Sequence, residues 1–147
     1  MNVTLRRATQ LDEDLIFYWR NLPEIYNLGK EKRSVEKNEH RLWFQSALQN
    51  THHLFLIITF FDLDCGVIRY NRIKDQEWEV SIYIVEKRSK GIGKEALNLS
   101  YSFLPKGATI IANVLRNNAE SIKFFHKNEF SEIKTDGSEL IKMIRKT

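Results

Sequence analysis

The sequence predicts an α+β protein in which about seven strands form a mixed, mostly antiparallel sheet flanked by about four helices. Apolar residues follow a helical spacing through much of residues 11–50, and then the chain turns β-rich from residue 54 to residue 85. Short links between the strands of that middle stretch are typical of an antiparallel meander. A strand, a turn and a helix between residues 77 and 103 lead to another strand at 109–115, and such a crossover is expected to be parallel and right-handed.

The first third of the chain is expected to hold one strand and two helices. Val3–Arg7 alternates apolar and polar residues, as a half-buried strand does. Thr9 can cap a helix with an acidic first turn, and Pro23 and Gly29 are expected to end that helix. Ser34 is expected to cap the second helix. The apolar residues of this second helix are Leu42, Trp43, Phe44, Ala47 and Leu48.

The remaining elements are read from their apolar runs and from the residues that interrupt them. Strands are expected at 54–61, 66–71, 77–85, 109–115, 130–134 and 139–144. One helix is expected over 91–103, because Pro105 and Gly107 stop it. Another begins at Asn117 or Asn118, either of which can act as its cap, and ends at Asn128.

Composition sets the class of protein. A chain of 147 residues is expected to form one domain over residues 1–147. The longest apolar run, 54–61, is too short for a membrane span, and the first ten residues lack the apolar stretch of a signal peptide, so a cytoplasmic protein is expected. One cysteine excludes an intramolecular disulfide and a cysteine-based zinc site. The net charge of +4 favours an anionic partner but is too small to indicate nucleic acid.

The motif that carries chemistry is a basic glycine turn between a strand and a helix, Arg88-Ser-Lys-Gly91-Ile-Gly93-Lys94. Glycines let the backbone turn tightly and bring several N–H groups toward one point, and the N-terminus of the following helix adds partial positive charge. The turn therefore predicts a pyrophosphate site, with a plain basic turn as the alternative. It lacks the Gly-Lys-Ser/Thr ending of a P-loop and the third glycine of a dinucleotide fingerprint.

Arg88-x-x-Gly91-x-Gly93 after the strand 79–84 resembles the acetyl-CoA signature of the GNAT superfamily of N-acetyltransferases. A second match lies downstream, where Asn118, Ser121, Phe125 and Phe130 follow that family's Asn-x-x-Ala-x-x-x-Tyr-x-x-x-x-Phe pattern in part. The resemblance covers nearly the whole chain. It implies the GNAT fold, with a central pair of parallel strands that splay apart, and acetyl-CoA as the cosubstrate without a metal.

The resemblance also implies which residues hold acetyl-CoA. The backbone of one splayed strand would pair with the pantetheine arm, the glycine turn would bind pyrophosphate, and the next helix would line the cofactor. The residues expected at the cofactor are Ile82, Tyr83, Ile84, Arg88, Ser89, Lys90, Gly91, Ile92, Gly93, Lys94, Asn113, Asn118, Ser121, Phe124 and Lys127. For Phe124 a plain core position is the alternative.

The N-terminal half resembles the GNAT branch that acetylates amino-sugar nucleotides in bacterial pseudaminic acid and related pathways. The matching stretches are 19–21, 40–44 and 66–69. The residues expected at the acceptor are Trp19, Arg20, Asn21, His40, Trp43 and Arg69. Arg20 is expected to contact the anionic part of the acceptor and His40 to lie near the sugar. The alternatives are core packing for both indoles and an ion pair of Arg20 with Asp12 or Glu24.

Acyl transfer needs a group that takes the proton of the attacking amine. Glu79, on the cofactor strand, is the first choice, with Glu77 and His40 as alternatives. The family's usual tyrosine, a proposed acid for the leaving thiolate, is Phe125 in this chain, and Tyr83 is a possible substitute. Glu129 stands where the family usually has glycine.

Three functions follow from these residues. The first is N-acetylation of a small-molecule amine on a sugar nucleotide. The second is acetylation of a protein N-terminus or ribosomal protein, and the third is a non-catalytic acyl-CoA-binding module, which the missing tyrosine would permit. No nucleic acid or membrane partner is expected, and the oligomeric state, a homodimer included, stays open.

Overall fold

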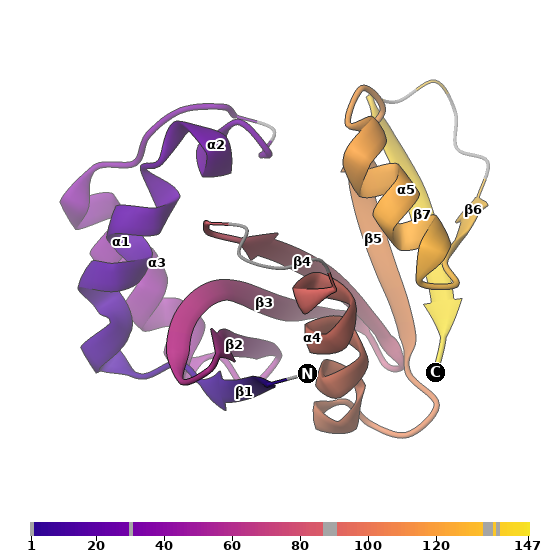
Figure 1. Cartoon of the computed structure of the whole chain (residues 1–147), viewed down its shortest axis with the longest axis horizontal. Helices are drawn as coiled ribbons and strands as arrows, with labels where there is room; N and C mark the ends of the chain where they lie inside the picture. The colour runs from indigo at the N-terminus through magenta and orange to yellow at the C-terminus, as the bar shows by residue number, and fades with distance from the viewer. Residues whose placement is uncertain (1, 30, 87–90, 134–136, 138) are drawn as a thin grey trace.

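The computed structural model describes residues 2–29, 31–86, 91–133, 137 and 139–147. Its strands form one sheet in the order β1-β2-β3-β4-β5-β7-β6, and β4 and β5 are the parallel pair among them (Figure 1). This arrangement confirms the predicted mixed, mostly antiparallel sheet. The strands are β1 Val3–Arg7, β2 His53–Phe60, β3 Leu63–Lys74, β4 Glu77–Ile84, β5 Thr109–Leu115, β6 Ser131–Ile133 and β7 Leu140–Lys146.

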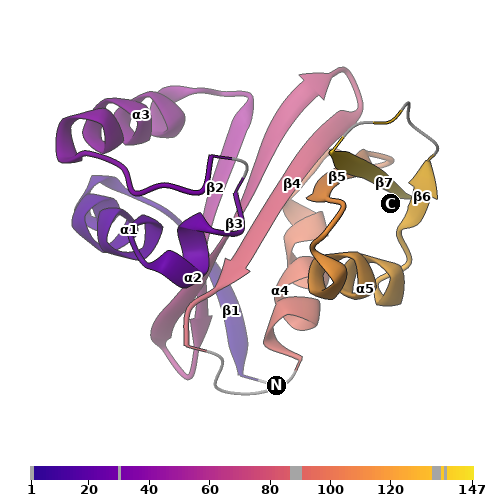
Figure 2. The ribbon, with the colours of Figure 1, turned by 90° about the horizontal axis from the view of Figure 1, so that it is seen from above.

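Helices cover both faces of the sheet. The helices α1, α2 and α3 pack on one face of β2, β3 and β4, whereas α4 and α5 lie on the other face (Figure 2). The helices are α1 Glu13–Arg20, α2 Pro23–Tyr26, α3 Lys37–Gln49, α4 Ile92–Ser100 and α5 Ala119–Lys127, with 3-10 turns at Gln10–Asp12 and Tyr101–Phe103. None of the helices in the described part of the chain is long and apolar enough to cross a membrane.

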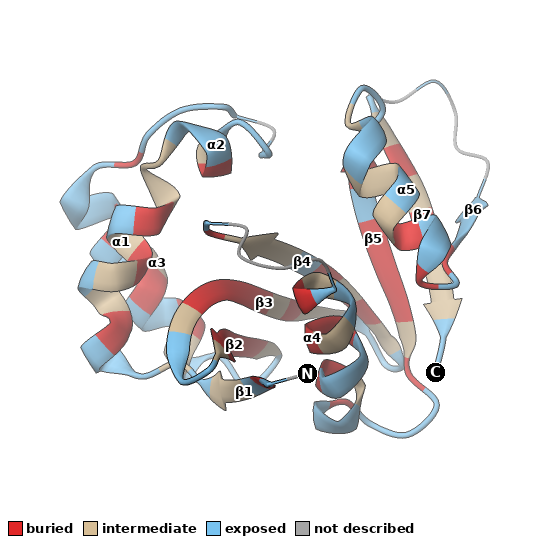
Figure 3. Ribbon diagram, in the orientation of Figure 1, coloured by how far each residue is buried: buried red, intermediate tan, exposed pale blue. Residues whose placement is uncertain are grey.

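Two separate cores follow from the alternation of side chains along β2. Leu56 and Ile58 point into the larger core under α4 and α5, and Phe55 and Ile57 point into the smaller core under α1 and α3. Buried residues therefore lie along the strands and on the helix sides that face them (Figure 3). A strand that is buried on both faces reads as the continuous apolar run seen in the sequence.

The parallel pair is joined over a short length only. Its pairing runs from Glu77–Thr109 to Glu79–Ile111, after which β5 continues beside β7 and diverges from β4 (Figure 1). Among the described residues, 80–84 of β4 therefore have no strand partner on the β5 side. This is the splayed pair that the resemblance implied, and its opening is called the fork below.

The N-terminal elements are tied together by polar side chains. Thr9 acts as a cap, but of the 3-10 turn Gln10–Asp12 that leads into α1 and not of α1 itself. Its hydroxyl accepts from the Leu11 amide at 3.3 Å, and the Asp12 carboxylate accepts from the Thr9 amide at 2.8 Å. Arg6 donates to Asp12 at 2.8 and 2.9 Å and to Asp64 at 2.9 and 3.2 Å, which joins β1 to β3. Burial raises the pKa of Asp12, but the hydrogen bonds from Arg6 and Thr9 outweigh burial and leave the pKa below its usual value.

One N-terminal expectation was met in part and another was wrong. The first helix ends at Arg20, before Pro23, but Pro23 then begins the short helix α2, where its fixed φ suits the first turn, so five α-helices are described where about four were expected. Ser34 does not cap α3, which begins at Lys37 after Glu36 in an extended conformation. The cause is that the side-chain oxygen of Asn21 accepts from the Val35 amide at 2.6 Å, and this bond holds the chain extended beside α1.

The ends of several other elements differ by a few residues from the expected ones. The strand β3 spans Leu63–Lys74 rather than 66–71, because a tight turn with positive φ at Phe61 (49°) and Asp62 (64°) joins it directly to β2. The helix expected over 91–103 ends as an α-helix at Ser100 and continues as a 3-10 turn. The last strand, β7, begins at Leu140 and reaches Lys146 rather than residue 144.

Candidate active site

The glycine turn leads into α4 as the sequence predicted. Gly91 is the N-cap of α4 and has a φ of 96°, a conformation that residues with a Cβ rarely adopt. Gly93 has a different role, since a Cβ at that position would lie 3.1 Å from the Phe124 ring of α5. Ile92 is buried and Lys94 is exposed, whereas the expected cofactor residues Arg88, Ser89 and Lys90 lie outside the described residues.

The fork brings together a carboxylate and an amide from different strands. Asn113 of β5 donates its Nδ2–H to Oε2 of Glu79 at 2.6 Å. Ile82 and Ile84 pack their side chains against the larger core, so the backbone of this stretch of β4 runs along the open edge. The fork thus combines free strand-pairing groups with a candidate base.

The first turn of α5 is organised by its cap. The side-chain oxygen of Asn118 accepts from the Ser121 amide at 3.1 Å, so part of its hydrogen-bonding capacity is used within the helix. Phe124 is half-buried and packs on Gly93 and Phe125, which agrees with its core alternative. Lys127 is exposed in the last turn of α5.

Two arginines lie against one indole on the opposite face of the sheet. The guanidinium carbon of Arg20 is 4.3 Å from the Trp43 ring centroid, and that of Arg69 is 5.1 Å from the same centroid. Burial lowers the pKa of each arginine. No carboxylate of the described chain forms an ion pair with either one, and the nearby acids Glu31 and Glu39 are bound by Arg33. We call Arg20, Trp43 and Arg69 the arginine–indole cluster.

His40 contacts the arginine–indole cluster from its buried side and is not part of its exposed surface. The ring is 1% exposed and stacks on Phe44 at 5.6 Å, so the structure does not place it where a sugar would touch it. Its Nδ1 is 3.0 Å from Nη1 of Arg20, and its Nε2 is 3.0 Å from the carbonyl oxygen of Glu13. Because arginine can only donate, Nδ1 must accept and Nε2–H must donate, which fixes a neutral tautomer. Burial, with a smaller contribution from Arg20, lowers the pKa of His40.

Trp19 and Asn21 serve the fold in this structure. Trp19 is 4% exposed and packs edge-on against Tyr83 at 6.4 Å, as its core alternative predicted. Asn21 holds Val35, and Arg20 pairs with His40 rather than with Asp12 or Glu24. Of the six expected acceptor residues, Arg20, Trp43 and Arg69 are the ones that meet in a partly exposed cluster.

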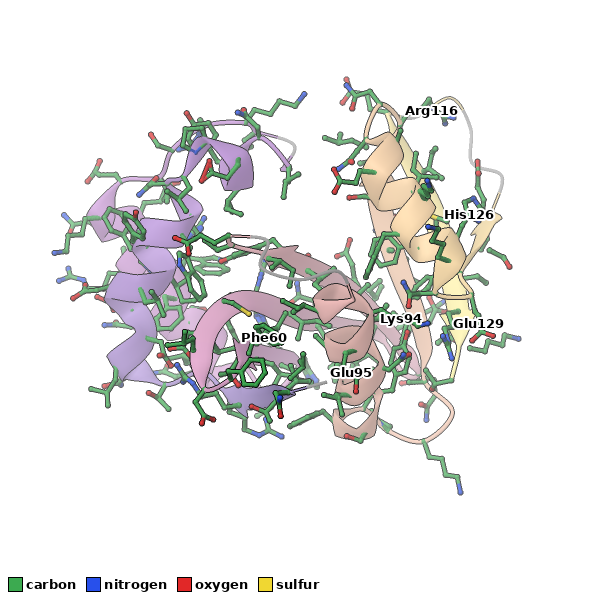
Figure 4. All side chains as sticks on the ribbon, in the orientation of Figure 1. Phe60, Lys94, Glu95, Arg116, His126 and Glu129 are labelled. Carbon is green, nitrogen blue, oxygen red and sulfur yellow. The ribbon has the colours of Figure 1, made fainter. Side chains whose placement is uncertain are left out.

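Tyr83 and Phe125 differ in environment. Burial raises the pKa of Tyr83 although Arg69 and Arg20 lower it, so its hydroxyl stays protonated at neutral pH. Phe125 is 5% exposed and packs edge-on against Phe124 and Phe130, as a core residue does. His126 is exposed on the outer surface of α5 (Figure 4).

His53 and Phe55 of β2 lie beside Arg69 although no motif in the sequence marks them. The ring centroid of Phe55 lies 5.8 Å from the guanidinium carbon of Arg69, and the His53 ring stacks on the Phe55 ring. Burial, and then the charge of Arg69, lowers the pKa of His53 to about 4, and its buried Nε2 has no hydrogen-bond partner within the described chain. These neighbours follow from the register Phe55–Arg69, which no local pattern in the sequence specifies.

Comparison with known proteins decides the family. The model of the acetyltransferase (GNAT) domain matches residues 2–131. The chain belongs to the GNAT acetyltransferase family. The acetyltransferase PseH of Campylobacter jejuni is 27% identical to this GNAT chain over 135 residues, which cover 88% of the chain and 85% of PseH.

Solved structures agree with the GNAT fold. The crystal structure of C. jejuni PseH has a TM-score of 0.72 at 20% identity and covers 99% of both chains. A spermidine N-acetyltransferase from Vibrio cholerae, in complex with CoA and spermine, has a TM-score of 0.82 at 18% identity over 99% of this chain and 95% of its own. No group of three or more metal-ligating side chains comes together among the described residues of this GNAT protein.

Proposed function

We propose that this GNAT acetyltransferase transfers an acetyl group from acetyl-CoA to the primary amine of a nucleotide-linked amino sugar. The observation that carries the acceptor assignment is the arginine–indole cluster, in which two partly buried guanidinium groups share one ring without a carboxylate partner in the described chain. The resemblance to PseH, although only 27% identical, supports the same acceptor class.

The physical argument rests on the cost of burying charge. A desolvated cation is unfavourable unless an anion or a set of acceptors compensates it. Arg69 has ring contacts but no hydrogen bond within the described residues, so a bound anion would supply what the protein does not. A diphosphate offers two adjacent anionic groups that match two guanidinium groups. An indole beside them provides a flat surface for a sugar or a base.

The same charges disfavour other amines. Arg20 and Arg69 would repel a polyamine such as spermidine, which is cationic at neutral pH. A peptide N-terminus is also cationic and would favour an acidic lining. The arginine–indole cluster therefore supports an anionic acceptor over both alternatives.

The chain's own residues suggest how the reaction is arranged. The family's acetyl-CoA supplies an activated acetyl group. The backbone of Ile82–Ile84 along the fork would hold its pantetheine arm, and Gly91 with the N-terminus of α4 would hold its pyrophosphate. Glu79 would accept the proton of the attacking amine, and Tyr83, which stays protonated, could donate to the leaving thiolate.

An acceptor panel tests this function. The protein would be incubated with acetyl-CoA and, separately, with UDP-linked amino sugars that carry the free amine at different ring carbons, spermidine and a peptide with a free N-terminus. Release of free thiol would be measured. Turnover of at least one UDP-linked amino sugar well above the other amines is expected, and a preference for spermidine or the peptide would refute the proposal.

The variant Arg69→Met connects that result to the arginine–indole cluster. KM for the UDP-linked amino sugar should rise about tenfold or more if a charge-assisted hydrogen bond is lost. Thermal stability should not fall, because the variant removes a buried charge and keeps a long apolar side chain. Arg72→Met is the matched control, because Arg72 lies on the same strand and is bound to Asp75 instead.

A further inference from the structure

We infer that Asn113 is a positioning residue that holds the carboxylate of Glu79 for proton transfer at the fork. The inference rests on the proposed role of Glu79 as the base. It differs from the cofactor contact that the sequence suggested for Asn113.

The position of Asn113 follows from the register of the splayed strands. The last paired residues of β4 and β5 are Glu79 and Ile111. Asn113 lies two residues farther along β5 and therefore points to the same face as Ile111. Its side chain reaches back across the widening gap to Glu79, where Nδ2 and Oε2 are 2.6 Å apart. The side chains thus continue the connection between the strands where the backbone pairing stops.

The chemistry of the two groups fixes their orientation. An ionised carboxylate only accepts hydrogen bonds, and the amide oxygen also accepts, so the amide must turn its Nδ2–H toward Glu79. A hydrogen bond to a charged acceptor is short and strong, as the observed distance indicates. This bond therefore holds the carboxylate in one orientation at the fork.

The bond occupies one carboxylate oxygen and leaves the other available. Within the described residues Oε1 of Glu79 has no hydrogen-bond partner, so it can accept a proton from an amine or from a water between them. A glutamate on a strand has three rotatable side-chain bonds, and holding one oxygen removes most of that freedom before substrate binds. Asn71 of β3 is the register partner of Glu79, and Arg69 lies two residues from Asn71 on the same face of that strand, so the base and the arginine–indole cluster are on one side of the sheet.

Two charged groups of neighbouring strands bear on any pH measurement at this site. Arg69 belongs to β3, and Lys142 of β7 is the register partner of Asn113. Both cations are retained in the variants below, so a change in pH dependence reports on the pair of Asn113 and Glu79.

The test compares Asn113→Ala, Asn113→Asp, Glu79→Gln and the double variant Glu79→Gln/Asn113→Ala. Each would be assayed with acetyl-CoA and the best acceptor of the panel, whichever amine that is. Asn113→Ala should lower kcat about ten- to hundredfold, as misplacement of a reacting group does. KM for acetyl-CoA and its Kd by calorimetry should stay within about twofold of wild type, because positioning acts on the catalytic step rather than on uniform binding. In the Glu79→Gln background the same change should have almost no effect, because the group that Asn113 positions is gone.

Asn113→Asp tests whether the side chain of residue 113 lies beside the base. The aspartate keeps the shape but puts a second carboxylate beside Glu79, so the acidic limb of the kcat/KM profile should move to higher pH. A merely structural tie would be recognised from Asn113→Ala, which would then lower the melting temperature and leave the kcat of the folded enzyme near that of wild type. Equal losses from Asn113→Ala in both backgrounds, an unmoved limb, or a large rise in the acetyl-CoA Kd would each overturn the inference.

Failure of this inference and failure of the proposed function give different results. If spermidine or the peptide is the best acceptor, the proposed acceptor class is wrong, yet the coupling of Asn113 to Glu79 can still be measured with that amine. If Glu79→Gln keeps wild-type kcat, Glu79 is not the base and the inference falls whatever the acceptor.

Discussion

The two faces of the sheet present sites of different construction. One face carries α4 and α5, and we call it the cofactor face because we propose that acetyl-CoA binds there; its groups suited to bind are backbone groups, at Gly91 and along 80–84 of β4, and their geometry comes from φ angles and from strands that part. The other face carries α1 and α3, and we call it the acceptor face because we propose that the amine binds there; its groups are side chains from three elements, with Arg20 on α1, Trp43 on α3 and Arg69 on β3. A backbone site tolerates many sequences, whereas a side-chain site depends on each residue.

This difference implies that the faces respond to mutation in different ways. A change of side chain on the cofactor face acts through backbone conformation or through charge placed near the glycine turn and the N-terminus of α4. A change on the acceptor face removes a specific partner. The four predictions below test that contrast, from the largest expected effect to the smallest.

Gly91→Asp should have the largest effect, on acetyl-CoA binding. It puts a carboxylate at the N-terminus of α4, where a pyrophosphate would otherwise sit, and it forces a residue with a Cβ to a φ of 96°. We expect Kd for acetyl-CoA, measured by calorimetry, to rise at least about a hundredfold, or ~3 kcal/mol. Gly91→Ala introduces the backbone strain alone and should raise Kd for acetyl-CoA by about tenfold or less. Wild-type affinity in Gly91→Asp would mean that the pyrophosphate binds elsewhere.

Arg20→Ala should act on the other face and spare the cofactor. Loss of a charge-assisted hydrogen bond should raise KM for the anionic acceptor by ~1.5–3 kcal/mol in free-energy terms, which is about ten- to a hundredfold. Acetyl-CoA affinity should hardly change, because the cofactor face is built separately. If instead the melting temperature falls and the kinetic constants of the folded enzyme stay normal, Arg20 only anchors α1 through His40.

The contrast between the faces also explains what the sequence could predict. The order of the elements along the chain and the parallel crossover follow from apolar patterning, whereas the splayed pair was expected only from the resemblance to the GNAT family. The glycine turn and the Asn118 cap are local motifs. The partly exposed cluster on the acceptor face depends on register and on which helix side is buried. His40 was therefore expected near the sugar although it is buried, and the bond between Asn113 and Glu79 was not foreseen.

The errors in the fold have the same origin. Ser34 has the residue type of a helix cap, but the bond from Val35 to Asn21 spans 14 residues and delays the start of α3. A local rule cannot include a partner that only the tertiary structure brings near. The sequence could predict that Thr9 acts as a cap, because both of its hydrogen-bond partners lie within three residues.

The acceptor face should also carry an acid-sensitive element of stability. The pKa of His53 is about 4 in the folded state and about 6.5 when unperturbed, so between these values the unfolded chain binds a proton that the folded chain does not. The stabilisation is complete above pH 6.5 and is lost as the pH falls toward 4. Because His53 is partly exposed, we expect the free energy of unfolding to fall by only ~1 kcal/mol. That loss would lower the melting temperature by about 2–4 °C.

His53→Phe isolates this contribution. The phenylalanine ring can keep the stacking on Phe55. The substitution also removes the buried Nε2, which lacks a hydrogen-bond partner in the described chain. The melting temperature of the variant should therefore fall less than that of wild type between pH 6.5 and pH 4.5. His52→Gln, at an exposed neighbouring position, should follow the wild-type curve. Parallel curves for His53→Phe and wild type would show that His53 does not titrate in this range.

The smallest effect is expected at the end of α5 on the cofactor face, where Glu129 lies beside β7 (Figure 4). Glu129 has a φ of 70°, and the helix closes with bonds from the Phe130 amide to the Phe125 carbonyl at 3.0 Å and from the Glu129 amide to the His126 carbonyl at 3.1 Å. This Schellman motif usually has glycine at that position. The exposed carboxylate of Glu129 pairs with Arg145 at 3.1 Å, but such a pair contributes little.

Glu129→Gly should therefore stabilise the protein by ~0.5–1 kcal/mol, measured by urea unfolding, because relief of the left-handed conformation exceeds the loss of the exposed ion pair. Glu129→Ala is the matched control, since it removes the ion pair but keeps the Cβ, and it should be neutral or slightly destabilising. Arg145 also donates to the carbonyl oxygen of Asn128 at 2.8 Å, and this bond survives both changes. If glycine is no better than alanine, the ion pair rather than the backbone decides the residue at this turn, and the cofactor face would depend on side chains as the acceptor face does.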